Sequence, residues 1–308
     1  MGGSKKKYDV VVIGGGPAGL SAGIYTSRAR LSTLLIEKGM VGGQIVNAEQ
    51  VENYPGFSEG ISGFDLTQSM HRQATKFGME TLNADVIGIG VNGEQKVVKT
   101  AQGDFVARAL IIAGGSERQK LDIPGEAEFT GKGVSYCATC DGAFFREKPV
   151  AVVGGGDAAL TEALHLTRFA SKVTVIHRRH ELRATRILQE KALAEPKIEL
   201  LWDTTVEEVA GGNFVDRITV SHVTGGEKAV IDIAGVFVSI GFKPNTDYLK
   251  SILTLDKTGA IVVDENMATV VPGIFAAGDI RSNSIRQVIS AAGDGAIAAV
   301  SAGKYIGE

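Results

Sequence analysis

The sequence contains little cysteine, tryptophan or net charge, and it has no long apolar run. Two of its 308 residues are cysteine, one is tryptophan, and the formal net charge is −3. This balance excludes the strongly basic surface typical of nucleic-acid binding and a polybasic membrane anchor. No stretch approaches the ~18 consecutive apolar residues of a membrane-spanning helix. We therefore expect a cytoplasmic protein that binds neither nucleic acid nor membrane.

The two cysteines stand three residues apart, as Cys137-Ala-Thr-Cys140. A structural disulfide framework would use more cysteines, and a zinc site would need two further ligands, so we expect no metal. In a cytosolic chain, a lone pair at this spacing favours redox chemistry. Asp141 follows at once. It could move a proton to or from a departing thiolate, or it could be a turn residue before Gly142.

Glycine is abundant, with 40 residues against a typical level of about 7%, and its clusters mark a repeated unit. Each copy has a β-branched run, a glycine loop, a small-residue helical pattern and a second strand. The first copy uses 8–13, 14–19, 18–28 and 32–37, and the second uses 148–153, 154–159, 158–169 and 172–177. The two copies are offset by 140 residues. This order is typical of a dinucleotide-binding unit.

The loops read Gly14-x-Gly16-x-x-Gly19 and Gly154-x-Gly156-x-x-Ala159. The first glycine permits the tight turn, and the second lets a pyrophosphate approach the backbone. The third residue, Gly or Ala, lets the helix pack closely on the strand. The phosphates then rest on the free N–H groups at the helix N-terminus.

The residue that ends the second strand distinguishes the two nucleotides. Glu37 lies 23 residues after Gly14, where an acid binds a ribose 2′-hydroxyl. The matching residue after Gly154 is His177, and Arg178 and Arg179 follow it. Arginines make charge-assisted bonds to a 2′-phosphate, which an acid would repel. The first unit should hold an unphosphorylated adenosine, and the second should hold NADP(H).

Three later apolar strands end in glycine, at 109–115, 236–241 and 274–279. The last lies beyond the second nucleotide unit, which indicates that the first domain is interrupted. We predict an α/β fold with two Rossmann-like, three-layer ββα domains. Residues 1–118 and 248–308 form the FAD domain, and residues 119–247 form the inserted NADP(H) domain that carries the cysteines. A flavin is expected because a nicotinamide gives a hydride, whereas a disulfide accepts electrons through thiolate chemistry.

These residues resemble the low-molecular-weight thioredoxin reductases, from Tyr8 to Ile306. The matching stretches are GGGPAGLSA (14–22), GGQIVNAEQVENYPGF (42–57), CATCDGAFF (137–145), GGGDAALTEAL (154–164), HRRHELRA (177–184) and AAGDIRSNSIRQVISAAGDGAIAA (276–299). CATCD and HRR at this spacing are highly specific, whereas the glycine loops alone are not. The resemblance implies a cytoplasmic homodimeric flavoprotein oxidoreductase that reduces thioredoxin, or a thioredoxin-like protein, with NADPH. It also implies that the NADPH domain rotates during turnover.

The resemblance also implies roles for individual residues. Cys140 would face the flavin, Cys137 would attack thioredoxin, and Asp141 would be the acid–base group. FAD would be bound by Gly14, Gly16, Pro17, Ala18, Gly19, Glu37, Gly43, Gln44, Asn53, Gly114, Asp279, Arg286, Gln287 and Val288. NADPH would be bound by Gly154, Gly156, Asp157, Ala158, Ala159, His177, Arg178, Arg179 and Arg183.

The chain departs from the family at three places. Ala113-Gly114-Gly115 replaces Ala-Thr-Gly, Thr161-Glu162 replaces an acidic pair, and His180 replaces a common Asp. The last two departures bear on nicotinamide affinity. The alternatives are a reductase of another disulfide (small-molecule, thioredoxin-like or peroxiredoxin-linked), an enzyme fed by a different electron donor, and a non-catalytic redox sensor.

Overall fold

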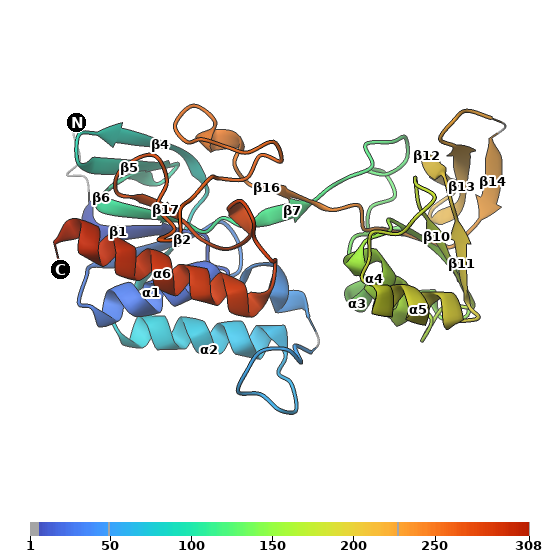
Figure 1. Ribbon diagram of the computed structural model, residues 1–308, viewed down its shortest axis with the longest axis horizontal. Coiled ribbons are helices and arrows are strands. Elements are labelled where there is room, and N and C mark those ends of the chain that lie inside the picture. The colour runs from blue at the N-terminus through green and yellow to red at the C-terminus, as the bar shows by residue number, and fades with distance from the viewer. Residues whose placement is uncertain (1–5, 49, 227, 308) are drawn as a thin grey trace. The chain divides into compact units, whose positions relative to one another are not determined.

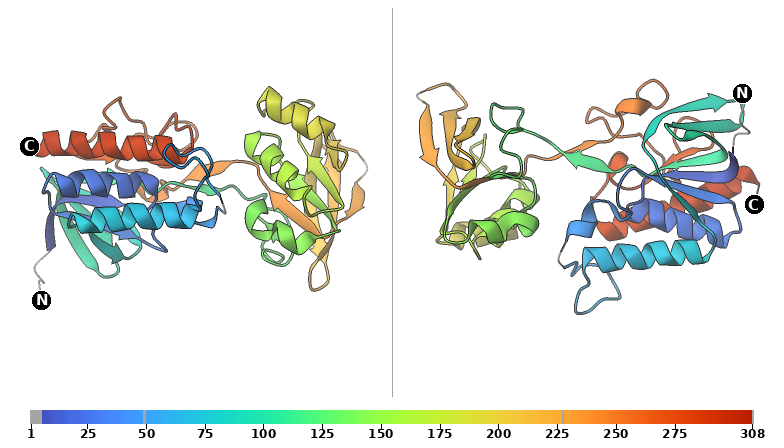
Figure 2. Two further views of the ribbon diagram at one scale, coloured as in Figure 1. Left: turned by 90° about the horizontal axis from the view of Figure 1, so that it is seen from below. Right: turned by 180° about the vertical axis from the view of Figure 1, so that it is seen from behind.

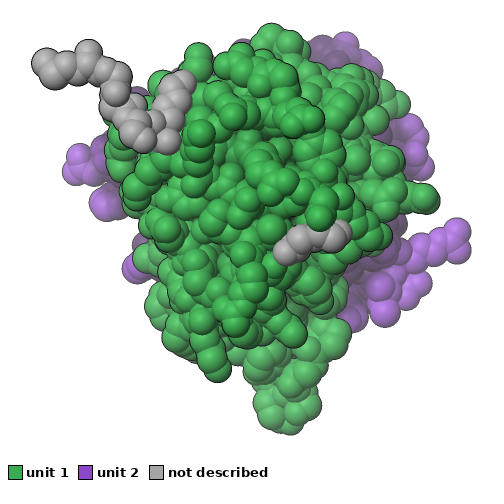
Figure 3. All heavy atoms as spheres, turned by 90° about the vertical axis from the view of Figure 1, so that its left-hand side faces the viewer, with its two compact units in different colours: residues 1–117, 243–308 green, residues 118–242 purple. Residues whose placement is uncertain are grey.

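The computed structural model describes residues 6–48, 50–226 and 228–307, and the chain divides into two compact units. Unit 1 is formed by 1–117 and 243–308, and unit 2 by 118–242 (Figures 1 and 3). The predicted boundaries, after 118 and after 247, lie one and five residues further along. The second boundary comes earlier because Asn245 bonds back to unit 1, through its N–H to Gly115 O at 3.1 Å and its side-chain amide to Gly114 O at 2.9 Å.

Unit 1 is built on one large sheet with three long helices. Its strands are β1 (Lys6–Ile13), β2 (Thr33–Glu37), β3 (Glu80–Asn83), β4 (Val86–Asn92), β5 (Gln95–Thr100), β6 (Gly103–Ile112) and β17 (Ile274–Ala276). Its helices are α1 (Pro17–Arg28), α2 (Gly63–Lys76) and α6 (Val288–Ile306), with 3-10 turns at Gly43–Asn47, Asp247–Leu249 and Gly278–Ile280. The connecting strands β7 (Ser116–Arg118) and β16 (Phe242–Pro244) pair with each other.

The sheet of unit 1 has the strand order β3-β2-β1-β6-β5-β4, with β17 also pairing with β6. Strands β1, β2, β3, β6 and β17 run parallel, and β4 and β5 add an antiparallel edge. Successive residues of β1 point to opposite faces. Val10 and Val12 join the core beneath α1, α2 and α6, and Val11 and Ile13 join a second core on the other face (Figure 1). Both faces of the sheet are therefore buried.

Unit 2 repeats this design on a smaller scale. Its strands are β8 (Val134–Ser135), β9 (Pro149–Val153), β10 (Lys172–Ile176), β11 (Ile198–Leu201), β12 (Thr204–Gly211), β13 (Val215–His222), β14 (Ala229–Asp232) and β15 (Gly235–Val238). Its helices are α3 (Ala138–Asp141), α4 (Asp157–Leu166) and α5 (Arg186–Ala194), with a 3-10 turn at Gly142–Phe145.

The main sheet of unit 2 is parallel, in the order β11-β10-β9-β15-β8, and β12, β13 and β14 form a separate antiparallel sheet. Val150 and Val152 of β9 pack beneath α4 and α5, whereas Ala151 and Val153 join the core of the antiparallel sheet. Figure 2 shows the ribbon of this unit from two further sides. The α/β fold with two Rossmann-like domains is confirmed. Among the described residues, no helix combines the length and apolarity that a membrane span requires.

Candidate active site

The loop after β1 has the geometry that a dinucleotide pyrophosphate requires. Gly14 has φ +104°, and a Cβ added there would lie 2.3 Å from the Ala113 carbonyl oxygen. A Cβ on Gly19 would lie 1.8 Å from Gly14 O. In contrast, the nearest atom to a Cβ on Gly16 is 3.9 Å away, and Gly16 starts α1 without a side-chain cap. The loop is therefore closely packed where it turns and open at the helix N-terminus, where phosphates bind.

Glu37 lies directly beneath this loop. Its Oε2 accepts a hydrogen bond from Gly15 N at 2.6 Å, and its Oε1 accepts one from Gly39 N at 2.9 Å. Each carboxylate oxygen has a second lone pair, so the half-buried group can still accept bonds from ribose hydroxyls. Glu37 is thus fixed in place by backbone donors rather than by a cation.

The other residues predicted to surround the flavin also lie in unit 1. Gln44 donates through its amide to the Ser116 carbonyl, and Asn53 donates to Gln287 Oε1 at 3.0 Å across 234 residues of sequence. Asp279 accepts from the Ser284 hydroxyl at 3.1 Å, and burial raises the pKa of this carboxyl above its ordinary range. Gly43 also approaches the first loop, because a Cβ on it would lie 3.0 Å from the Gly16 Cα.

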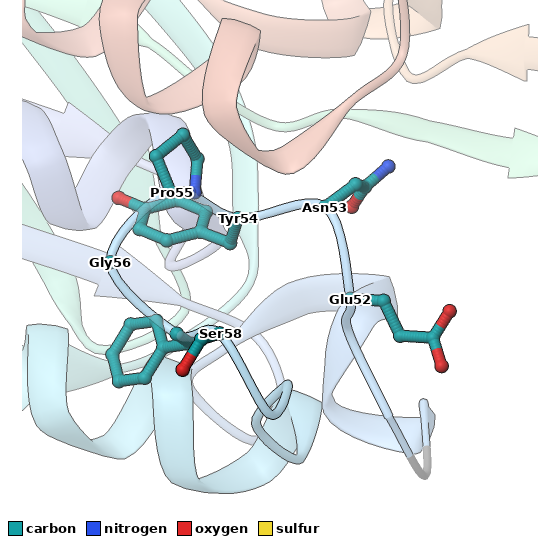
Figure 4. Close-up of a pocket in the computed structure, with 7 residues that line it drawn as sticks. Glu52, Asn53, Tyr54, Pro55, Gly56 and Ser58 are labelled. Carbon is teal, nitrogen blue, oxygen red and sulfur yellow. The ribbon is translucent and has the colours of Figure 1, made fainter.

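A surface hollow of about 530 Å³ lies within the loop after Val51 (Figure 4). It is lined by Glu52, Asn53, Tyr54, Pro55, Gly56, Phe57 and Ser58. Glu52 and Asn53 extend away from the loop in Figure 4. Asn53 is the one predicted FAD ligand among these lining residues.

The loop after β9 reproduces the first loop with the predicted offset of 140. Gly14 N donates to Ile36 O at 2.8 Å, and Gly154 N donates to Ile176 O at 3.0 Å. Gly154 has φ +149°, and a Cβ on it would lie 2.2 Å from Ser239 O. A Cβ on Gly156 would meet nothing within 4 Å. Asp157 accepts from Thr185 N at 2.6 Å, so this side chain fastens the loop to the start of α5.

His177 and the arginines that follow it occupy different environments. The imidazole of His177 is only 6% exposed, and its Nε2 bonds to Glu181 O at 3.0 Å. A Cβ on Gly155 would lie 2.4 Å from the ring, so His177 is packed beneath its loop as Glu37 is beneath Gly15. Burial, followed by the nearby arginine charges, lowers the pKa of His177, which favours the neutral ring. Arg178, Arg179 and Arg183 are exposed beside it.

Cys137 and Cys140 form a disulfide at the start of the short helix α3. The sulfur of Cys137 accepts a hydrogen bond from Cys140 N at 3.2 Å and contacts the Thr139 hydroxyl at 3.3 Å. Asp141 Oδ2 accepts from the Ser135 hydroxyl at 2.6 Å. The acid follows the pair directly in sequence, and its side chain is held by Ser135, a strand residue that precedes the pair.

Sequence reasoning missed three contributors to this site. Ser135 is 5% exposed and contacts both Asp141 and Cys137. Phe144 is an aromatic side chain with 74% exposure, four residues after Cys140. Asp294 binds the turn that carries Asp279, through Gly278 N at 3.0 Å. Phe144 lies within the CATCDGAFF stretch, three residues after Asp141, but no local pattern marks the pairings made by Ser135 and Asp294.

Comparison with known proteins places this geometry in a family. The family described as pyridine nucleotide-disulphide oxidoreductase matches residues 8–295. The chain is 49% identical over 305 residues to a thioredoxin reductase of Bacillus subtilis, covering 99% of this chain and 96% of that one. It is 47% identical to a thioredoxin reductase of Listeria innocua over 100% of this chain and 97% of the relative.

A solved structure agrees with the sequence comparisons. The thioredoxin reductase of Lactococcus lactis, in the form described as the FR conformation, aligns with a TM-score of 0.90 and 43% identity, over 97% of this chain and 99% of that one. The repeated glycine loops and the cysteine pair fall within the matched residues. The chain belongs to the pyridine nucleotide-disulphide oxidoreductase family.

Proposed function

We propose that this protein is an NADPH-dependent flavoprotein that reduces the disulfide of thioredoxin through FAD and the Cys137–Cys140 pair. One observation carries the proposal: unit 2 combines a redox disulfide with an arginine-flanked dinucleotide loop. Relatives that are nearly half identical over almost the whole chain are thioredoxin reductases. A flavin, when bound, takes a hydride from a nicotinamide and passes two electrons to a disulfide.

The residues of unit 1 fit FAD. The open Gly16 position and the free N–H groups at the start of α1 suit a pyrophosphate, and Glu37 keeps lone pairs for ribose hydroxyls. We assign Gly14, Pro17, Ala18 and Gly19 to this cradle. Further along the flavin we assign Gly43, Gln44, Asn53, Gly114, Asp279, Arg286, Gln287 and Val288.

The residues of unit 2 fit NADPH. The space beside Gly156 accepts a pyrophosphate, and the exposed Arg178, Arg179 and Arg183 can bind a 2′-phosphate. Gly154, Asp157, Ala158 and Ala159 shape the loop. In this assignment, the buried His177 supports the loop from below and places no negative charge beside the phosphate.

Within the pair, we assign Cys137 as the sulfur that attacks thioredoxin. The Cys140 N–H and the Thr139 hydroxyl both point at Cys137 Sγ, and such donors stabilise a thiolate there after reduction. Cys140 would then exchange electrons with the flavin, and Asp141 would supply or accept the proton. Phe144, which is exposed and stands four residues after Cys140, would contact the partner protein.

We also propose that the protein is a homodimer and cytoplasmic. Three exposed apolar side chains of helix α6 lie on one side of it at the helical repeat, with exposures of 44% at Ile289, 42% at Ile297 and 48% at Val300. This stripe suits the same face of a second copy, as in a two-fold dimer. The cytoplasmic location is inferred from the low cysteine content, because the two cysteines of the sequence form the redox pair and leave none for structural disulfides.

The test is the rate of NADPH oxidation by the purified yellow protein, with and without thioredoxin. We expect thioredoxin-dependent oxidation that disappears in Cys137→Ser. If NADPH fails to reduce the flavin, the assignment of Arg178 and Arg179 is wrong and another electron donor serves the enzyme. If the flavin is reduced and thioredoxin adds nothing, the substrate is a different disulfide. If the protein reduces no disulfide substrate at all, it is a non-catalytic redox sensor.

A further inference from the structure

Ser135 makes a compact set of contacts around the redox pair. It ends strand β8 and is 5% exposed, so its hydroxyl is shielded from water. Its oxygen lies 2.6 Å from Asp141 Oδ2, 3.0 Å from the Cys137 backbone nitrogen and 3.3 Å from the Cys137 carbonyl oxygen. One hydroxyl thus touches the proposed acid–base group and both backbone polar groups of the proposed attacking cysteine.

These contacts satisfy the ionised carboxylate. A hydroxyl has one hydrogen to donate and two lone pairs that accept. When Asp141 is a carboxylate, the Ser135 hydrogen points to Oδ2 at 2.6 Å, and its oxygen accepts the Cys137 N–H. A hydrogen bond to a charged oxygen is typically short, and the observed distance of 2.6 Å fits this state.

The same heavy-atom positions also satisfy the protonated acid. With a proton on Oδ2, Asp141 becomes the donor to the Ser135 oxygen, whose second lone pair still accepts the Cys137 N–H. The Ser135 hydrogen then turns to the Cys137 carbonyl oxygen at 3.3 Å. No donor or acceptor is lost: one proton is added on Asp141, and the Ser135 hydrogen alone changes direction. An amide or a methyl group at this position could not reverse its role in this way.

We propose that Ser135 is a positioning residue that holds Asp141 in one orientation through both of its protonation states. The proposal rests on the reductase function above, because in that reaction Asp141 gains and loses a proton in each turnover. The Cys137 thiolate attacks the substrate disulfide, and one substrate sulfur leaves as a thiolate. The Cys140 thiolate then attacks Cys137 Sγ, which re-forms the enzyme disulfide and releases the second substrate thiolate. Two electrons pass to the substrate. Asp141 takes the proton of the Cys140 thiol, which makes the Cys140 thiolate, and gives that proton to a departing substrate thiolate.

We expect Ser135→Ala to slow thiol–disulfide exchange and to leave the binding of thioredoxin unchanged. General acid–base catalysis contributes roughly 10²- to 10⁴-fold, and a loosely held acid should lose about 10-fold of this. The kcat for thioredoxin should fall by that factor with KM unchanged, and its solvent deuterium isotope effect should rise. Stopped-flow reduction of the flavin by NADPH should keep its wild-type rate. Ser135→Thr, which keeps the hydroxyl, should restore exchange.

A double-mutant cycle with Asp141→Asn separates this role from a structural one. If Ser135 acts through Asp141, Ser135→Ala costs nothing further in the Asp141→Asn background. Thr167→Ala is the matched control, because it also removes a hydroxyl in unit 2 but one that bonds to the Leu164 carbonyl oxygen, so it should leave the rate and the isotope effect unchanged.

Equal losses in both backgrounds, or a wild-type rate in Ser135→Ala, would overturn the proposal. The cycle is also run with a small aromatic disulfide, which exchanges with the same cysteine. If wild type reduces that compound but not thioredoxin, the partner assignment fails while Ser135 is still tested.

Discussion

The buried ion pair between Arg281 and Asp294 allows the sharpest test of how unit 1 holds its cofactor. Asp294 accepts Arg281 Nε at 2.7 Å and Nη2 at 2.8 Å, and it also accepts Gly278 N at 3.0 Å. The side chains are 15% and 8% exposed. Asp294 therefore fixes the turn at Gly278, next to the proposed FAD ligand Asp279. Breaking one partner of a buried pair costs about 3–5 kcal/mol, because the other charge is left uncompensated.

We predict that Asp294→Asn destabilises unit 1 by about 3 kcal/mol. This value is at the lower end of the range for a broken buried pair, because the amide oxygen can still accept one hydrogen bond. For a unit of this size, the flavin-release midpoint should fall by roughly 6–12 °C. The lone tryptophan, Trp202, lies in unit 2, so its fluorescence reports the other unit separately. Thermal unfolding followed by flavin and Trp202 fluorescence should show the first transition moving and the second unchanged.

Two further variants make this prediction refutable. Glu117→Gln breaks an ion pair with Lys38 in which both side chains are 63% exposed, and it should cost less than about 1 kcal/mol. Arg281→Met combined with Asp294→Leu removes both charges but leaves Gly278 N unpaired, which costs about 1–3 kcal/mol. The reasoning fails if Asp294→Asn is as stable as Glu117→Gln, or if the Trp202 transition moves with the flavin transition.

Four shorter predictions follow from unit 2. Gly156→Ala should fold normally, because its Cβ meets nothing within 4 Å, but should raise the KM for NADPH about 10-fold by filling the phosphate space; melting curves and kinetics measure both effects. Arg179→Gln should weaken NADPH about 10- to 100-fold in titrations and leave NADH unchanged. Because the folded-state pKa of His177 lies below its usual 6.5, its contribution to stability is fully present above that pH and lost as the pH falls through the lowered value. His177→Gln should therefore flatten the acid limb of the Trp202 unfolding profile. Phe144→Ala should raise the KM for thioredoxin, while turnover with a small aromatic disulfide stays at the wild-type rate.

Local spacing predicted the parts of the fold that depend on short-range geometry. Gly14 and Gly154 follow their strands as expected. Both have a positive φ, and a Cβ on either residue would lie only 2.2–2.3 Å from a carbonyl oxygen, so only glycine fits. Side-chain direction was harder to predict. His177 was predicted among the nucleotide ligands, and the structure adds that its ring packs beneath Gly155, a direction that the spacing does not indicate. The spacing places the residue at the end of its strand, whereas the packing of the loop above it decides where the ring points.

Contacts between distant segments could not be predicted from one sequence. Asn53 bonds to Gln287 across 234 residues, and nothing near either residue indicates the other. Ser135 and Asp141 are six residues apart, but their bond depends on the chain turning back through α3. These bonds set the orientation of predicted site residues. The sequence therefore identifies the chemical groups, and the tertiary fold determines their geometry.

The two repeats also indicate where their nucleotide preference arises. The pairing of β1 with β2 matches that of β9 with β10 residue for residue at the offset of 140. Within this shared frame, the carboxylate of Glu37 and the imidazole of His177 occupy the same place under their loops. The lowered pKa of His177 favours a neutral ring. Having His177 in the second unit where the first has Glu37 therefore removes a negative charge without adding a positive one. In the proposed assignment, the positive charge of the second site comes from the exposed Arg178, Arg179 and Arg183, which follow the repeated unit in sequence. In the proposed assignment, His177 removes repulsion of the 2′-phosphate and the arginines supply the attraction.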